Sequence, residues 1–529
     1  MGRVYDGEWA VPALLVDRAE RFAADTAVVS EQGDLTYERV ADRAARVAGF
    51  LRTIGIAPGD RVATLLPSTV DYVAAWHGIV WAGAIDVPIN VEYKGTFLQH
   101  LLRDSGSRAL VIDARWAGRL DAIDAPDLEH VVVLGDGRDL EGSRAVHRFA
   151  DALAAGPVAP ARASDTDTTY IMYTSGTTGP AKGVVHNHRS SFHYIQPWAT
   201  GLELTPDDVC YSMFPLFHQM GRSACVFAAM WNGIPVVLRD GFSVSGFWDD
   251  IRETGATYMG YFGALLAMLW NQEPSARDRD HRLSRAFGAS APPELMTPWR
   301  DRFGVELIEV YGSTEIGLGS GLGSGPPKQG TMGLPCRHVE LRIVDGNDDP
   351  VPPHVIGEAV WRPKYRDAIF QGYWNRPEAT IEAWRNLWFH SGDAGYVDDE
   401  GYFVFVDRLK DTIRRRGENI SSFGVEEAVR NEPGVLECAA FAVPSGLAAT
   451  EEEVMVAIVA VPGAEPDPAA LFRSLCESMP RHAVPRYLRF VDELPKTPTL
   501  RVQKAVLREQ GVTASTVDRE ALGIFPPKE

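Results

Sequence analysis

Short apolar segments with the length of β-strands alternate with helical patterns along the first 320 residues of this chain. Val40, Ala44, Val47, Leu51 and Ile54 recur at a spacing that places their side chains on one face of a helix. Strands that are separated by helices imply parallel sheets that helices cover. The expected strands lie at residues 61–66, 109–113, 130–134, 169–173, 235–238 and 307–311.

The rest of the chain divides into further segments. Its 529 residues are too many for a single hydrophobic core. Residues 330–407 are rich in glycine, proline and short apolar segments, which predicts a small β-rich subdomain. A charge run at 408–418 has no apolar face and is typical of a linker. We therefore predict an α/β N-terminal domain of largely parallel sheets at 1–407, a hinge at 408–411 and a smaller α+β C-terminal domain at 412–529.

Composition excludes several classes of protein. The formal net charge of −19 repels nucleic acid and anionic lipid, so we expect neither a nucleic-acid partner nor membrane insertion. The longest apolar stretch, at 73–89, is interrupted by His77 and Asp86 and predicts a buried helix followed by a strand. Five dispersed cysteines and an N-terminus without an apolar run predict a cytoplasmic protein.

Residues 173–184 have the composition of a phosphate-binding loop. They combine four Ser or Thr hydroxyls and three glycines with a single lysine, Lys182. Glycines let backbone N–H groups point inward, hydroxyls add donors, and the lysine adds a full positive charge. The spacing is not that of a Walker A loop, because Gly179 is followed by Pro180. A polar surface hairpin is the plain alternative. The nucleotide-binding residues expected here are Thr174, Ser175, Gly176, Thr177 and Thr178.

This segment resembles the signature loop of the superfamily that contains acyl-CoA synthetases, peptide-synthetase adenylation domains and beetle luciferases. The similarity covers nearly the whole chain. Residues 242–314 and 414–423 most resemble bacterial crotonobetaine/carnitine-CoA ligases. The resemblance implies that ATP activates an acid as an acyl-AMP and that the C-terminal domain moves between two reaction steps.

The segment from Tyr311 to Glu315 offers groups suited to a nucleotide. Tyr311 has a flat face for adenine, and Thr314 has a hydroxyl for the α-phosphate. Glu315 is a hard oxygen ligand for Mg²⁺. The resemblance implies these same roles, although a Tyr-Gly-x-Thr-Glu string alone is usually a turn. The neighbours Gly312 and Ser313 belong to the expected site.

Small residues at Gly288, Ala289 and Ser290 would let the backbone approach the edge of adenine. Asp393 offers a carboxylate for both ribose hydroxyls, which is the task that the resemblance implies. Arg408 fits a second ribose or phosphate contact. A tight turn is the plain alternative for both segments.

The acid pocket is expected near His218, which lines the acid tunnel in the enzymes that this chain resembles. Tyr258, Tyr261 and Phe262 are expected to border this pocket together with Gly312. Their aromatic rings would stack on an aryl acid or cage a quaternary ammonium group, or would simply belong to the core.

The resemblance places the hinge at Lys410 and a catalytic lysine near the C-terminus. Leu500 and Arg501 stand where the resembling enzymes have Gly-Lys, and Lys504 lies three residues later. Arginine keeps the positive charge but has a longer, planar head. Either Arg501 holds the attacking carboxylate in place of lysine, or this reaction step has changed.

We therefore predict an enzyme that adenylates a small or medium organic acid with ATP and Mg²⁺, releases pyrophosphate and passes the acyl group to CoA. One alternative adenylates nitrite and transfers it to an aryl amine, as ATP-dependent diazotases do. Another is a non-catalytic nucleotide-binding homologue, which the intact Lys182, Thr314, Glu315 and Asp393 argue against. A homodimer is one assembly that we expect for such an enzyme.

Overall fold

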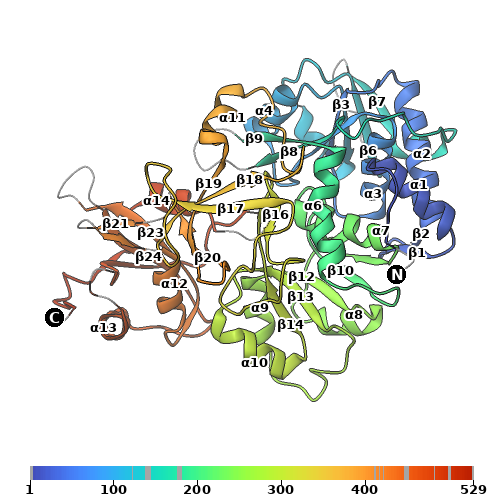
Figure 1. The fold of residues 1–529 in the computed structure, drawn as a ribbon. Coiled ribbons are helices and arrows are strands. Elements are labelled where there is room, and N and C mark those ends of the chain that lie inside the picture. The colour runs from blue at the N-terminus through green and yellow to red at the C-terminus, as the bar shows by residue number, and fades with distance from the viewer. Residues whose placement is uncertain are drawn as a thin grey trace. The chain divides into compact units, whose positions relative to one another are not determined.

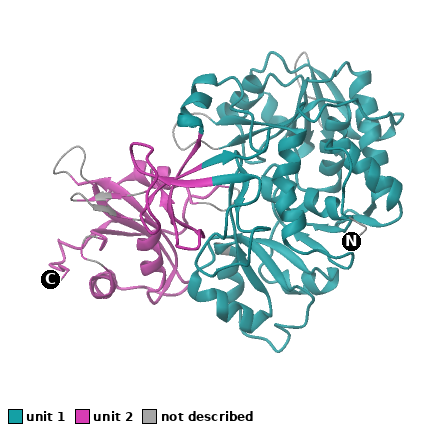
Figure 2. Ribbon diagram, in the orientation of Figure 1, with its two compact units in different colours: residues 1–340, 361–387 teal, residues 341–360, 388–529 magenta. Residues whose placement is uncertain are grey.

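The structure is a computed structural model, shown in Figure 1. It describes residues 4–121, 123–136, 144–174, 181–409, 411, 413–415, 418–420, 422–445, 452–479, 481, 483–497 and 502–526. The chain divides into two compact units (Figure 2). The large unit comprises residues 1–340 and 361–387, and the small unit comprises residues 341–360 and 388–529. The domain boundaries at 407 and 411 remain a prediction.

The first of two seven-stranded sheets in the large unit contains four of the predicted strands. Its strands are parallel, except that β9 runs antiparallel to β8. The order is β7 (Ala145–Arg148), β6 (His130–Leu134), β5 (Ala109–Asp113), β3 (Arg61–Leu65), β4 (Ile85–Pro88), β8 (Thr168–Thr174) and β9 (Lys182–Asn187).

The second seven-stranded sheet contains the remaining two predicted strands. It is parallel apart from the short antiparallel pair of β1 and β2. The order is β14 (Glu306–Glu309), β13 (Arg285–Ala289), β12 (Tyr258–Phe262), β10 (Cys210–Ser212), β11 (Val236–Leu238), β1 (Thr26–Val29) and β2 (Leu35–Thr36).

Helices cover these sheets, as the alternating pattern predicts. Helix α2 (Tyr37–Thr53) begins at Thr36, whose hydroxyl accepts the Arg39 amide, and it buries Val40, Ala44, Val47 and Leu51. The other helices of the large unit are α1 (Val11–Arg21), α3 (Val70–Trp81), α4 (Gly95–Ser105), η1 (Ala114–Leu120), α5 (Phe149–Ala154), α6 (His188–Gly201), η2 (Met220–Phe227), α7 (Ala228–Asn232), α8 (Phe247–Thr254), α9 (Gly263–Trp270), α10 (Pro293–Phe303), α11 (Pro377–Ala383) and η3 (Arg385–Leu387).

A buried ion pair connects the first sheet to η2, which is a π-helix packed on β10 and β12 of the second sheet. Asp86 on β4 binds Arg222 of η2, and both side chains are almost fully buried. The Arg222 guanidinium also lies 4.1 Å from the ring centroid of Trp76 and 5.4 Å from that of Tyr170. Thr64 donates a hydrogen bond of 3.1 Å to Asp86. The charge of Arg222 therefore has its partners on β4 and β8 of the first sheet and on α3.

The β-rich segment and the C-terminal part follow the predicted pattern. Residues 339–408 contain a sheet of four strands, β17 (Val339–Val344), β18 (Gly357–Pro363), β19 (Phe389–Val397) and β20 (Phe403–Arg408). The hairpin of β15 (Tyr311–Ser313) and β16 (Gly317–Ser320) precedes it. The later elements are β21 (Ile413–Arg415), β22 (Glu418–Ile420), α12 (Ser422–Arg430), β23 (Val435–Pro444), β24 (Glu452–Ala460), α13 (Pro468–Ser478), β25 (Tyr487–Phe490), α14 (Lys504–Gln510) and β26 (Val517–Asp518).

The predicted fold class is confirmed, since helix-covered, largely parallel sheets precede a smaller α+β region. The predicted linker run is partly structured, because β21 and β22 form a short antiparallel ribbon within it. Among the described residues, no helix combines the length and the apolar character needed to cross a membrane.

The Asp86–Arg222 pair leads to a prediction about stability. Replacement of Arg222 by Leu leaves the Asp86 carboxylate buried without its cation, so we expect a loss of about 3–5 kcal/mol in the free energy of unfolding. Arg103→Ala is the control, because the Arg103–Asp124 pair is largely exposed and should contribute less than about 1 kcal/mol. Urea denaturation followed by circular dichroism measures both. Equal midpoints for the two variants would contradict this role of Arg222.

Candidate active site

The predicted phosphate-binding segment begins and ends in a hairpin of the first sheet. Strands β8 and β9 pair so that Thr174 lies opposite Lys182. The Thr174 hydroxyl donates a weak hydrogen bond of 3.5 Å to the carbonyl oxygen of Lys182. Both side chains are half-buried. The predicted nucleotide-binding residues Ser175, Gly176, Thr177 and Thr178 lie outside the described residues.

Tyr373 joins Lys182 to Glu315. The Lys182 ammonium nitrogen lies 5.0 Å from the ring centroid of Tyr373, and the Tyr373 hydroxyl donates a hydrogen bond of 3.0 Å to Glu315 Oε1. Burial raises the pKa of Tyr373, and the negative charge of Glu315 raises it further, so the hydroxyl stays protonated and remains a donor. Lys182 and Glu315, which are distant in the sequence, thus both contact Tyr373.

Backbone hydrogen bonds hold Tyr373 in this place. Residues 370–374 run beside β9, where Val185 N–H donates to Gly372 at 3.0 Å and Trp374 N–H donates to Gly183 at 2.7 Å. Phe370 N–H donates to the carbonyl oxygen of Glu315 at 2.8 Å. The sequence analysis did not find Tyr373, because no motif surrounds it and these contacts form only in the fold.

His186 fixes the backbone at Thr314. It is buried on β9, on the same strand face as Lys182, and its Nε2 lies 2.7 Å from the Thr314 carbonyl oxygen. Burial lowers the pKa of His186 to about 4, so the ring is neutral at pH 7. The carbonyl can only accept, so Nε2 carries the proton and Nδ1 accepts from Ser190 at 3.0 Å. Sequence analysis missed His186 as well, although its spacing of four residues from Lys182 on a strand was a usable signal.

Tyr311 and Gly312 open the β15–β16 hairpin. The Tyr311 ring is buried and stacks on Trp361, with centroids 5.3 Å apart and planes 10° apart. A Cβ at Gly312 would lie 2.4 Å from the carbonyl oxygen of Gly317, so the hairpin excludes a side chain there. Ser313 accepts a long hydrogen bond of 3.4 Å from the Ile316 amide. The contact of Tyr311 with adenine remains a prediction.

The turn from Gly288 to Ser290 lies at the carboxyl end of β13, where parallel sheets commonly bind ligands. Gly288 pairs with Tyr261 of β12, and a Cβ at Gly288 would lie 2.1 Å from the Tyr261 carbonyl oxygen. Ala289 and Ser290 are exposed, and Ser290 has a left-handed backbone with φ of +67°. The close approach of strand β12 thus requires a glycine at position 288, while the role of this turn at adenine remains a prediction.

The residues predicted for the acid pocket have different surroundings. His218 is half-buried just before η2, and burial lowers its pKa to about 4. Its Nδ1 accepts the Met220 amide at 3.3 Å, so the neutral ring carries its proton on Nε2. Tyr258 and Tyr261 are fully buried, and Phe262 packs edge-on against Phe214. Their role in binding an acid remains a prediction.

In the small unit, Asp393 and Arg408 face each other across β19 and β20. Arg408 Nε lies 2.7 Å from Asp393 Oδ1, and the Asp393 side chain is 3% exposed. The binding of ribose hydroxyls by Asp393 and Arg408 remains a prediction. The predicted hinge residue Lys410 and the predicted catalytic residue Arg501 lie outside the described residues.

Side chains on either side of the predicted hinge contact one another within the small unit. Asp407 accepts the Ser422 hydroxyl at 2.6 Å and the Ser422 amide at 2.7 Å, at the start of α12. Lys504 lies 2.7 Å from Glu426, and Arg508 binds Asp411. Lys504, the alternative to Arg501, is therefore engaged in an ion pair.

The described residues contain no group of three or more His, Cys, Asp or Glu side chains that would hold a metal ion. The role of Glu315 as a Mg²⁺ ligand remains a prediction.

Two family models match the chain. The model of AMP-binding enzymes covers residues 15–374, and the model of the AMP-binding enzyme C-terminal domain covers residues 424–500. The long-chain-fatty-acid–CoA ligase FadD13 of Mycobacterium tuberculosis is 33% identical over 482 residues, or 90% of this chain and 93% of that protein. The crotonobetaine/carnitine–CoA ligase of Escherichia coli is 30% identical over 502 residues, or 91% and 95%.

Solved structures are similar over almost the whole chain. The anthranilate CoA ligase AuaEII in complex with anthranoyl-AMP has a TM-score of 0.86 and 26% identity, and the match covers 96% of this chain and 98% of that one. ATP-bound MatB from Rhodopseudomonas palustris has a TM-score of 0.83 and 26% identity, with coverage of 95% and 99%.

The close approach at Gly288 gives a prediction for this site. Gly288→Ala forces the backbones of β12 and β13 apart, so we expect a loss of about 1–3 kcal/mol in the free energy of unfolding. Gly241→Ala is the control, since no atom lies within 4 Å of a Cβ built there. Thermal unfolding monitored by calorimetry compares the two. An unchanged unfolding temperature for Gly288→Ala would mean that the strands tolerate a side chain.

Proposed function

Because the chain belongs to the family of AMP-binding enzymes, we propose that it joins an organic acid to AMP and then transfers the acyl group to the thiol of CoA. The predicted resemblance to adenylate-forming enzymes is confirmed by the two family models and by relatives that are CoA ligases. The observation that carries the proposal is the meeting of Lys182 and Glu315 at Tyr373.

The first step needs charge neutralisation at the phosphates of ATP. An oxygen of the acid attacks the α-phosphorus, the bond to the bridging oxygen of the β-phosphate breaks, and pyrophosphate leaves with the electron pair. Lys182 would face the negative charge that develops there, and the Thr314 hydroxyl would donate to the α-phosphate. Glu315 would hold Mg²⁺ together with phosphate oxygens. When bound there, the metal neutralises phosphate charge.

The second step transfers the acyl group. The CoA sulfur attacks the acyl carbon, the bond from that carbon to the AMP oxygen breaks, AMP leaves, and the thiol proton passes to solvent. CoA is the acceptor that we favour, because FadD13, the crotonobetaine/carnitine–CoA ligase and AuaEII are CoA ligases. The identity of the acid stays open, since those ligases act on acids as different as long-chain fatty acids and anthranilate.

The Asp393–Arg408 pair would bind the ribose hydroxyls of ATP, and rotation about Lys410 would separate adenylation from transfer. Such a rotation would have to break the hydrogen bonds from Ser422 to Asp407, because these two residues lie on opposite sides of Lys410 in the chain.

Glu315→Ala tests the adenylation step. We expect AMP release in the presence of ATP, Mg²⁺ and a panel of organic acids to fall by roughly a hundredfold, a typical loss for one electrostatic group at a reacting centre. Glu382→Ala on α11 is the control, because Glu382 is an exposed glutamate of the same unit. Near-normal AMP release by Glu315→Ala would exclude the proposed metal role. The absence of AMP release and of a CoA thioester by the wild type with every acid would contradict the proposed function.

Arg501→Ala and Lys504→Ala together identify the cation that positions the acid. If Arg501 holds the attacking carboxylate, its replacement should lower adenylation on the order of a hundredfold and spare thioester formation from preformed acyl-AMP. Arg501→Lys should keep much of the activity, because arginine acts there through charge and hydrogen bonding. Lys504→Ala should chiefly affect stability, because Lys504 pairs with Glu426. The reverse pattern would assign the role to Lys504.

A further inference from the structure

Tyr261, Gly288 and Glu309 form a row across three adjacent parallel strands. Gly288 of β13 pairs with Tyr261 of β12 on one side and with Glu309 of β14 on the other. Residues in register on parallel strands point to the same face of the sheet. Because Gly288 has no side chain, the Tyr261 ring can pass over it, and its hydroxyl donates a hydrogen bond of 2.6 Å to Glu309 Oε1. A Cβ at Gly288 would lie 2.8 Å from Tyr261 Cδ2.

The Glu309 carboxylate also binds the backbone of the turn that follows Gly288. Its Oε1 accepts the Ala291 amide at 2.8 Å, and its Oε2 accepts the Ser290 amide at 3.2 Å. The Ser290 backbone has a φ of +67°, a conformation that is costly for a residue with a side chain. Two adjacent amides that point at one carboxylate are the kind of interaction that stabilises such a turn.

The charge state of Glu309 governs this arrangement. The side chain is only 9% exposed, and burial raises the pKa of Glu309 to about 7, against the lowering effect of its three hydrogen bonds. The charged carboxylate accepts all three donors. Protonation adds an O–H donor to one oxygen and removes the negative charge, so the neutral carboxyl accepts the Ser290 and Ala291 amides and the Tyr261 hydroxyl more weakly. The hydrogen bonds are therefore strongest above about pH 7 and weaken as the pH falls below it.

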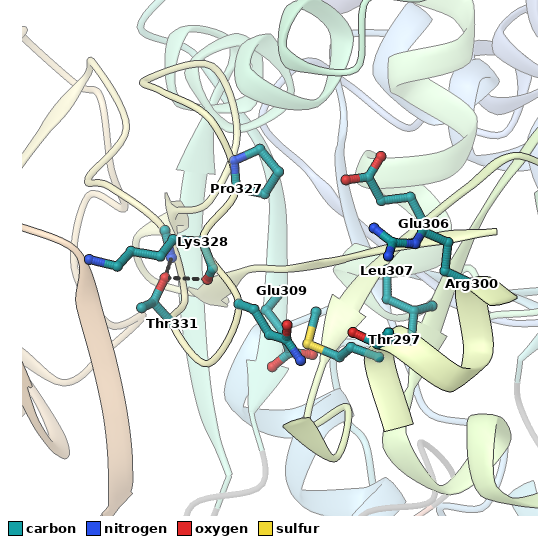
Figure 3. A pocket seen from close by; sticks show the side chains of 11 residues that line it. Thr297, Arg300, Glu306, Leu307, Glu309, Pro327, Lys328 and Thr331 are labelled. Atoms are coloured by element: carbon teal, nitrogen blue, oxygen red, sulfur yellow. Dashed lines mark hydrogen bonds between the residues drawn. The ribbon is translucent and has the colours of Figure 1, made fainter. Parts of the chain in front are cut away.

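Glu309 lines a cavity of about 200 Å³ between α10, β14 and the loop at 327–333 (Figure 3). The other charged residues that line this cavity are Arg300 on α10, Glu306 on β14 and Lys328 in the loop. Arg300, Glu306 and Lys328 are exposed, so solvent screens their charges. Tyr261 is the titratable group on the side of β12. None of the site residues predicted from the sequence lines this cavity.

We propose that Glu309 is a positioning residue of the nucleotide site, which holds the turn at 288–291 in the shape that binds the base of ATP. This inference rests on the proposed function, which requires ATP, and on the prediction that the edge of adenine lies against residues 288–290. Glu309 does not touch the phosphates or the acid in this role. Its loss should therefore raise the KM for ATP and leave kcat at saturating ATP almost unchanged.

The matched pair Glu309→Gln and Glu306→Gln tests this role by the initial rate of pyrophosphate release between pH 6 and pH 8. Glutamine keeps one acceptor oxygen but turns an amino group toward an amide donor. We expect Glu309→Gln to raise the KM for ATP on the order of tenfold at pH 8. The KM of the wild type should rise as the pH falls from 8 to 6, and that of Glu309→Gln should stay high and nearly constant. The KM of Glu306→Gln should change with pH as that of the wild type does. ATP titrates equally in both assays, so the difference between the two glutamine variants reports on Glu309.

Tyr261→Phe provides a second test that does not alter the carboxylate. The Tyr261 hydroxyl lowers the pKa of Glu309, so its removal should move the pH at which the KM of ATP rises to a higher value. If the wild type releases pyrophosphate and Glu309→Gln has the same KM and pH profile as Glu306→Gln, this inference is wrong and the proposed function stands. If the KM for ATP depends on pH in Tyr261→Phe as it does in the wild type, the inference about Glu309 is also wrong. This second test applies even if Glu309→Gln does not fold. No turnover and no ATP binding by the wild type would overturn both.

Discussion

The buried pair of Asp86 and Arg222 is the interaction on which the large unit most depends. Burial removes water from both charges, and without new partners this desolvation lowers the stability of the fold by several kcal/mol. Arg222 has such partners in Asp86 and in the faces of Trp76 and Tyr170. Asp86 lies on β4 of the first sheet, and Arg222 lies on the π-helix η2. Because η2 packs on the second sheet, this ion pair connects the two sheets.

Contacts lead from this pair to the candidate active site. Tyr170, which lies beside the Arg222 guanidinium, stacks on His186 with ring centroids 4.9 Å apart. His186 in turn donates to the backbone of Thr314. Burial keeps His186 and His218 neutral at pH 7, so they orient backbone and side chains without adding charge. Lys182 adds positive charge at the site, as an anion site requires in a chain with a net charge of −19.

Two constraints of sheet geometry shape the turn at 288–291. Parallel pairing puts Tyr261, Gly288 and Glu309 in one row, and the strand spacing leaves no room for a side chain at Gly288. The same absence of a side chain lets Tyr261 reach Glu309. A single glycine therefore permits both the close approach of β12 and the hydrogen bonds that hold Ser290 and Ala291.

The sequence by itself determined the features that depend on neighbours along the chain. The pattern of apolar residues predicted four strands of the first sheet, two of the second and the helix that buries Val40 and Leu51, because burial follows the local sequence of each element. Local composition likewise predicted Lys182 and Glu315 as site residues, and the structure brings both to Tyr373. Only the tertiary structure decided that Tyr373 lies beside them, that His186 binds the backbone of Thr314 and that Glu309 binds the turn at 288–291. Their partners are distant in the sequence. Hydrogen bonds between separate strands, and the burial that shifts a pKa, depend on the folded structure and cannot be predicted from the pattern of neighbouring residues.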